Sequence, residues 1–181
     1  TLIGAQFLRN PPAGWKPAGW TPSAQQAAAS GRNFTPADVV GTQQFWRMLV
    51  GYALGTSAGL MVISQVLPFI RGVVPGIGGA LAGAALLVGA FGNAGGRIFS
   101  GWMSDHFCRV RTLCLMVLVS AAMLPVLGRV HTLVLLWPAL AIVYYCFGTQ
   151  LSVYASLTAD FFGTRNVGAN YGLVFLAYGI A

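Results

Sequence analysis

The sequence predicts an all-α protein whose helices cross a membrane several times, and three observations lead to this prediction. Hydrophobic residues make up 56% of the 181 residues, charged residues only 7%, and the mean hydropathy is +0.72. A soluble domain carries about 25% charged residues, because it needs a solvated surface. The apolar residues here form long runs, each near the roughly 20 residues that a helix needs to cross a bilayer. Lipid is therefore the expected solvent for most of the chain.

Four spans and the beginning of a fifth follow one another along the chain. Because the chain starts with Thr rather than Met and stops inside an apolar run, we expect it to be a piece of a longer protein. The whole region 46–181 is predicted to be transmembrane helices and their short connections. The four apolar runs cover residues 46–69, 79–103, 112–128 and 132–159, and the fifth begins near residue 170.

The chain before the first span is predicted to contain a helix end and a linker. Residues 1–9 are interpreted as the end of an earlier transmembrane helix, which a Pro-Pro pair then terminates, because proline lacks an N–H and restricts the residue before it. Residues 10–45 are polar and rich in Pro, Gly, Ala and Gln, a composition typical of a flexible linker. Within it, residues 35–38 (Thr-Pro-Ala-Asp) have the pattern of a helix start, which predicts a short interfacial helix.

The positive charges predict the orientation of the spans. The net charge is +7, but the ten Lys and Arg residues are scattered between apolar runs, which argues against nucleic-acid binding. Seven of them fall in or beside the linker and in the connections after the second and fourth spans, whereas only Arg71 and Arg129 fall on the other side. Since cytoplasmic loops are enriched in basic residues, the linker 10–45 is predicted to be cytoplasmic.

Arg97 is the remaining basic residue, and it lies inside the second span. It precedes Asp105 by about 12 Å along a helix that rises 1.5 Å per residue, which is well within a hydrocarbon core about 30 Å thick. A charge at this depth costs about 2.5–3.5 kcal/mol on insertion scales and usually faces a water-filled cavity. A guanidinium group can hold a carboxylate bidentately, so we interpret Arg97 as an anion-binding residue. The alternative is that Arg97 pairs with an acid elsewhere and only holds helices together.

The second span has a polar stripe beside a stripe of small residues. Asn93 shares a helical face with Arg97, so Asn93 is predicted to contribute to the same site. The neighbouring stripe predicts close helix packing and consists of Gly92, Gly96 and Ser100. The first span has a similar ridge at Gly51, Gly55 and Gly59.

Five side chains in the later spans are further candidates to line the same cavity. Aromatic stripes on helices more often pack than bind, so both interpretations stay open for each of them. They are Tyr144, Phe147, Gln150 and Tyr154, which recur at roughly helical spacing in the fourth span, and Tyr178 in the fifth.

The sequence offers little for catalysis or metal binding. His106 and His131 are solitary and lie at opposite ends of the spans, there are too few acids for paired carboxylates, and the three cysteines imply no disulfide framework. We therefore expect no enzyme, no metal and no other cofactor. A channel, a receptor and a scaffold are the other classes open to a polytopic membrane protein.

The connection after the second span resembles the loop signature of the major facilitator superfamily. That pattern is Gly-x-x-x-Asp-(Arg/Lys)-x-Gly-(Arg/Lys)-x-(Arg/Lys), and Gly101, Asp105, Arg109 and Arg111 match it. His106 stands at the first basic position of the pattern, and Cys108 stands at its second glycine. An Asp near a helix end beside basic residues in a tight loop predicts a switchable cytoplasmic latch.

Three further stretches are similar to the oxalate/formate antiporter family of that superfamily: residues 8–15, 93–101 and 157–172. The resemblance covers nearly the whole chain and implies that its spans are helices 7 to 10 and the start of helix 11, in the C-terminal half of a carrier whose N-terminal half is missing here. It also implies alternating access between two six-helix halves, a small carboxylate anion as the transported partner, and a bacterial inner membrane. Related monocarboxylate transporters have a substrate-binding Arg at the position of Arg97.

Tyr178 departs from the members that carry oxalate, which have a Lys at this position. One cation matches a monoanion, whereas a dianion would leave a negative charge unpaired in a low dielectric. A monocarboxylate such as formate or lactate is therefore expected, with oxalate/formate exchange as the related activity. A non-carboxylate solute is the alternative, in which Arg97 is structural. No acid lies inside a span, so exchange is either anion for anion or coupled to protons through the missing half.

Overall fold

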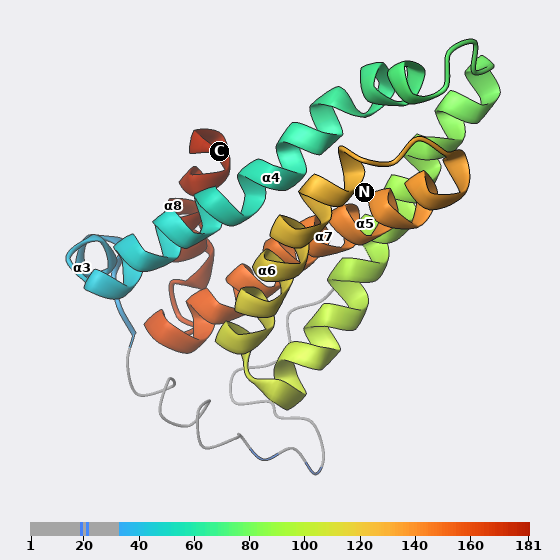
Figure 1. The fold of residues 1–181 in the computed structure, drawn as a ribbon. Helices are drawn as coiled ribbons and strands as arrows, with labels where there is room; N and C mark the ends of the chain where they lie inside the picture. Colours follow the sequence, from blue (N-terminus) through green and yellow to red (C-terminus); the bar gives the residue numbers. More distant parts are fainter. Residues whose placement is uncertain (1–18, 20, 22–32) are drawn as a thin grey trace, which may run out of the picture.

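The computed structural model describes residues 19, 21 and 33–181, and all regular structure in these residues is helical (Figure 1). The predicted all-α class is confirmed. The helix end predicted at 1–9 and most of the predicted linker lie outside the described residues. The helices are α3 (Pro36–Val40), α4 (Gln43–Val73), α5 (Gly79–Phe107), α6 (Arg109–Leu127), α7 (Leu133–Phe162) and α8 (Val167–Ile180).

Four of these helices, α4 to α7, are long and apolar enough to cross a membrane, and α8 is apolar but has only 14 residues. Large hydrophobic side chains also cover outward surfaces. On α5, for example, Phe91, Ile98 and Trp102 are each more than half exposed. Apolar surface of this extent is typical of a protein that faces lipid or other helices. The prediction of a polytopic helical membrane protein is confirmed.

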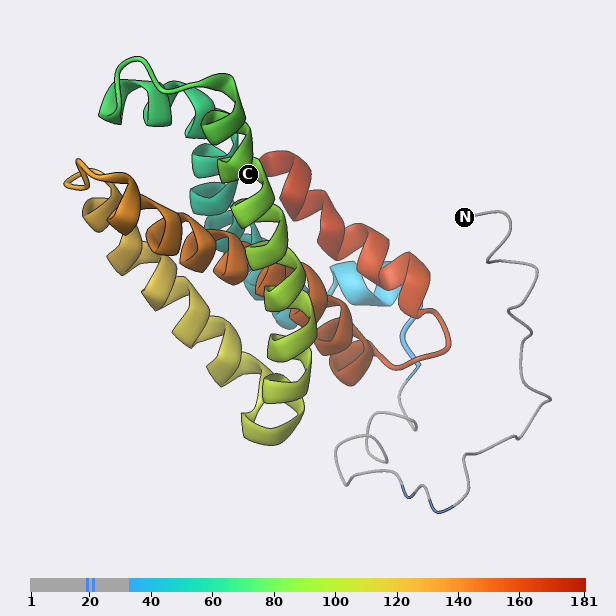
Figure 2. The ribbon, with the colours of Figure 1, turned by 90° about the vertical axis from the view of Figure 1, so that its right-hand side faces the viewer.

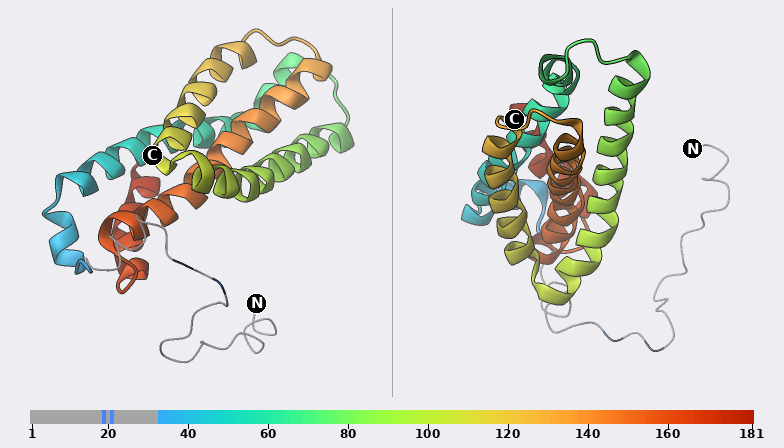
Figure 3. Two further views of the ribbon diagram at one scale, coloured as in Figure 1. Left: turned by 90° about the horizontal axis from the view of Figure 1, so that it is seen from below. Right: turned by 45° about the vertical axis from the view of Figure 1, so that its right-hand side comes forward.

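Helix α7 lies at the centre of the bundle. It packs most extensively with α5 and also contacts α4, α6 and α8. Figures 2 and 3 show it between α5 and α6. In the most apolar window of α7, 56% of the residues are buried, against 18% in α5. Helices α4, α5, α6 and α8 are therefore packed around α7.

Both predicted ridges of small residues pack against this central helix. On α5, a Cβ atom at Gly92 would lie 2.6 Å from the carbonyl oxygen of Ala141, and one at Gly96 would overlap the carbonyl oxygen of Tyr145. On α4, the three glycines of the ridge each face a large side chain of α7: Tyr154, Gln150 and Phe147. Glycine lets helix backbones approach this closely, so the predicted role of the two ridges in close packing is confirmed.

The helix that joins the linker to the first span begins as its sequence predicts. The Thr35 side chain accepts a hydrogen bond from the Asp38 N–H (3.4 Å), and the Asp38 carboxylate accepts one from the Thr35 N–H (3.0 Å). The hydrogen bonds that the Thr35 hydroxyl and, second, the Thr35 N–H donate to the Asp38 carboxylate lower the pKa of Asp38. Thr42 caps α4 in the same way, accepting from Phe45 N–H, and this is why α4 starts earlier than the predicted residue 46.

The connection between α5 and α6 is much shorter than predicted. Helix α5 continues to Phe107, and in its last turns the Ser104 hydroxyl donates to the Gly101 carbonyl (2.9 Å) and the His106 ring lies 2.9 Å from the Trp102 carbonyl oxygen. Only Cys108, with φ 129°, separates the two helices. The signature read as a loop is therefore helical: Gly101 and Asp105 lie in α5, and Arg109 and Arg111 lie in the first turn of α6.

The residues just before α3 are fastened to the junction of α7 and α8. The Phe34 N–H donates to the Phe162 carbonyl (3.0 Å), and the Phe34 carbonyl accepts from the side-chain amides of Asn166 (3.0 Å) and Asn170 (3.1 Å). The rings of Phe34 and Phe162 meet edge to face, with centroids 5.8 Å apart. We call these contacts the Phe34 anchor. They place the start of α3 beside the start of α8.

Candidate anion site and ion-pair junction

Arg97 lies near the middle of α5 with its side chain exposed on the described surface. Helix α5 is about 43 Å long, and Arg97 is about 6 Å beyond its middle residue, Asn93. The Arg97 Nε donates to the Asn93 Oδ1 over 3.4 Å. Both ion pairs found among the described residues belong to Arg109, so Arg97 has no carboxylate partner in this part of the chain.

Asn93 sits at a close approach of α5 to α7. A Cβ atom at Gly148 would overlap the Asn93 carbonyl oxygen and would lie 2.6 Å from its Oδ1. Gly148 is at the middle of α7, as Asn93 is at the middle of α5. The Arg97–Asn93 pair is therefore near mid-length of two spans that pack directly on each other.

The four candidates on α7 are buried in helix packing. Tyr144 faces Gly89 of α5, and the other three fill the spaces left by the glycine ridge of α4. Tyr154 also stacks on Tyr52, with centroids 4.3 Å apart and the rings 15° from parallel. Gln150 differs from its neighbours, because its Oε1 is buried without a hydrogen-bond partner among the described residues. Such a group points to an additional ligand, a water or an unseen partner.

Tyr178, on α8, is brought next to Phe147 but not next to Arg97. Its ring lies 6.3 Å from that of Phe147 and stacks on that of Phe175, with centroids 5.2 Å apart. Helices α5 and α8 do not form a packed pair. Of the predicted site residues, the structure thus joins Arg97 to Asn93 and Phe147 to Tyr178 as two separate groups.

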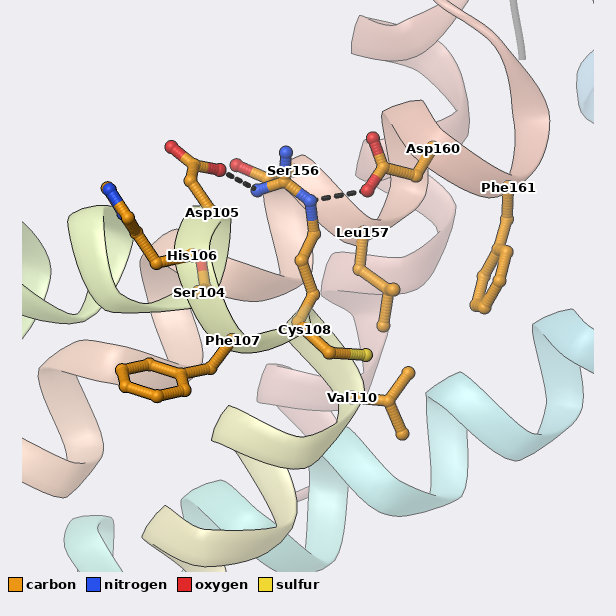
Figure 4. Close-up of a pocket in the computed structure, with 11 residues that line it drawn as sticks. Ser104, Asp105, His106, Phe107, Cys108, Val110, Ser156, Leu157, Asp160 and Phe161 are labelled. Atoms are coloured by element: carbon orange, nitrogen blue, oxygen red, sulfur yellow. Dashed lines mark hydrogen bonds and ion pairs between the residues drawn. The ribbon is translucent and has the colours of Figure 1, made fainter. Parts of the chain in front are cut away.

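A separate set of charged residues forms an ion-pair junction where α5 ends and α6 begins. Arg109 lies between two acids: its Nη1 is 3.0 Å from the Asp105 Oδ1, and its Nε donates to the Asp160 Oδ2. Figure 4 shows Asp105 on α5 and Asp160 on α7 on opposite sides of the bridging guanidinium. The Arg109 and Asp160 side chains are only 18% and 22% exposed, whereas that of Asp105 is 59% exposed. The ion pair between Arg109 and Asp160 is thus the better shielded of the two.

A pocket of about 590 Å³ opens at this junction, and polar groups supply much of its wall. Asp160 is not among the predicted latch residues, because it lies 51 residues from Arg109 and only the packing of α7 brings the two together. The pocket is lined by residues 104–110, 156, 157, 160 and 161.

The other matched positions of the signature take different roles. Gly101 faces open space, and Arg111 is exposed and takes no part in the two ion pairs of the described residues. The backbone N–H groups of Arg111 and Val110 hold the pKa of Cys108 below its usual value, since they favour the thiolate. Among the described residues, no group of three or more His, Cys, Asp or Glu side chains could hold a metal ion.

Membrane-length helices around one largely buried helix, with an arginine near mid-span and an ion-pair junction at one end, define a polytopic helical membrane protein. The chain belongs to the Major Facilitator Superfamily, whose family model matches residues 2–181.

Two curated relatives were found. The chain is 29% identical over 150 residues to the uncharacterized MFS-type transporter YhjX of Escherichia coli (strain K12), a match that covers 82% of this chain and 37% of the relative. It is 25% identical over 159 residues to the oxalate:formate antiporter of Oxalobacter formigenes, covering 84% of this chain and 37% of that protein. The chain thus spans 37% of the length of each of these relatives.

Proposed function

We propose that this chain forms helices 7 to 10 and part of helix 11 of a secondary transporter for small carboxylate anions. The observation that carries the proposal is Arg97, a cation at mid-span with no carboxylate partner among the described residues. A charge in that position needs an anion, and a carboxylate fits the guanidinium fork. The relative named as an oxalate:formate antiporter supports carboxylate chemistry. Transport, rather than catalysis, is the activity proposed.

The substrate would bind at the depth where α5 and α7 reach their middle residues, facing the N-terminal half of the carrier. Arg97 would bind the carboxylate, and the buried, unpartnered Oε1 of Gln150 would accept a hydrogen bond from a water molecule. Rocking of the two halves would then expose the site to each side of a bacterial inner membrane in turn. With the linker cytoplasmic, the ion-pair junction would lie at the cytoplasmic end and would break as α5 and α6 move against α7.

The test is ligand-dependent thermal stabilisation of the complete transporter in detergent. Formate, lactate, pyruvate, acetate and oxalate would be titrated against the wild type, Arg97→Ala and the control Arg129→Ala, whose arginine is exposed between α6 and α7. We expect a monocarboxylate to stabilise the wild type and the control. In Arg97→Ala its apparent Kd should rise at least tenfold, about 1.4 kcal/mol, because the cation is lost. Equal stabilisation of wild type and Arg97→Ala would make Arg97 structural and favour a non-carboxylate solute.

The absence of a second cation at Tyr178 predicts a preference for monoanions. Tyr178→Lys should shift the ratio of oxalate to formate uptake about tenfold or more towards oxalate, because a lysine on α8 would supply the second positive charge. Tyr178→Phe is the matched control, since it removes the hydroxyl without adding charge. Competition uptake in proteoliposomes measures the ratio. An unchanged ratio in the lysine variant would refute the charge argument.

A further inference from the structure

We infer that Asn93 is a positioning residue that orients Arg97, rather than a direct ligand of the substrate; this inference rests on the proposed anion site. The two residues are one helical turn apart, and the Asn93 Oδ1 accepts from the Arg97 Nε. This bond uses the inner nitrogen of the guanidinium. The two terminal nitrogens stay available to form parallel hydrogen bonds to both oxygens of a carboxylate.

The position of Asn93 is itself fixed by the packing of α5 on α7. Gly148 leaves room for the Asn93 carbonyl and carboxamide oxygens, and any side chain at 148 would displace them. An arginine has a long, flexible side chain, and its binding of an anion is weakened by the freedom it must give up. The hydrogen bond to the Asn93 Oδ1, which packing against α7 holds in place, removes part of that freedom before the substrate arrives.

The chemical type of the acceptor matters as much as its place. An amide oxygen orients the guanidinium without neutralising it, so the full positive charge remains for the substrate. A carboxylate at the same position would form an ion pair with Arg97 and compete with the substrate carboxylate. Since the Arg97 side chain has no acidic partner among the described residues, the neutral amide keeps this cation free for an anion.

The experiment compares Asn93→Asp with Asn93→Ala in the complete transporter, with Arg97→Ala alongside. Concentration-dependent uptake of the best monocarboxylate gives KM and the maximal rate, and thermal unfolding without substrate reports on the fold. We expect Asn93→Ala to raise KM about three- to tenfold with a maximal rate within about twofold of wild type. Asn93→Asp should raise KM further, because its carboxylate competes for Arg97.

Which of the two variants has the larger increase in KM distinguishes a positioning role of Asn93 from a packing role. Asp has nearly the shape of Asn, so a packing role predicts that Asn93→Asp is the milder change and Asn93→Ala the more harmful. If Asn93→Asp binds substrate as well as wild type while Arg97→Ala does not, the inference is overturned and the anion site stands. If Arg97→Ala leaves KM unchanged, the proposed function itself fails. A greater loss in Asn93→Asp than in Asn93→Ala, with both variants folded, supports the positioning role.

Discussion

Replacing Gly96 by Ala is expected to destabilise the bundle by more than about 3 kcal/mol, because overpacking that cannot be relieved by side-chain rotation moves backbones apart. The added Cβ would overlap the carbonyl oxygen of Tyr145, which belongs to the backbone of α7. Helices α5 and α7 form the most extensive packed pair, so separating them affects the whole bundle.

The adjacent Gly95 provides the matched control. A Cβ atom there would lie 3.8 Å from the Tyr145 ring, an ordinary contact, and alanine is favoured over glycine in a helix by about 1 kcal/mol. Gly95→Ala should therefore be neutral or slightly stabilising. Thermal unfolding and monodispersity of the two purified variants in detergent measure the difference. Equal stability of the two variants would show that α5 and α7 are less closely packed than described here.

Reversing the charge of Arg109 is expected to have the second-largest effect. Arg109→Glu would place three carboxylates around one pocket, with Asp160 shielded from solvent by α7. Removing one partner from a buried ion pair costs about 3–5 kcal/mol, and partial exposure here reduces this, whereas the new repulsion adds to it. We expect a loss of about 2–4 kcal/mol in the free energy of unfolding.

Arg111→Glu is the control for Arg109→Glu, because Arg111 is exposed on the same helical turn and lies outside the two ion pairs. Its effect on stability should stay within about 0.5 kcal/mol, as for most surface substitutions. Chemical or thermal unfolding of both variants gives the comparison. A similar loss in the two variants would mean that the general charge of this end matters, and not the ion-pair junction.

The sequence allowed the fold to be predicted because each span is defined by a local property. Apolar runs located α4 to α7, and the spacing of the glycines identified the faces that pack on α7. The helix ends were less predictable. Hydropathy detects where residues become polar, but α5 continues through the polar residues Ser104, Asp105 and His106 to Phe107.

The candidate site was predictable only in part. A single arginine within an apolar run is conspicuous, so Arg97 could be identified from the sequence. Asn93, four positions earlier on the same helix, necessarily lies beside it. The role of Asp160 depends on the parallel packing of α5 and α7, which brings the ends of both helices together and which no local pattern encodes. For Tyr144, Phe147 and Tyr154 the sequence could not decide between packing and binding, because both uses place an aromatic side chain on the inner face of a helix.

The Phe34 anchor determines how mechanical load would enter the bundle from the preceding chain. Its hydrogen bonds and ring contact act in parallel, and they hold Phe34 to the last residue of α7 and to the first turn of α8. A pull on the chain before Asn33 is therefore shared between the backbone that leads into α3 and the contacts with α7 and α8. Force on the chain before α3 is thus transmitted directly to α7, the helix that packs against every other described span.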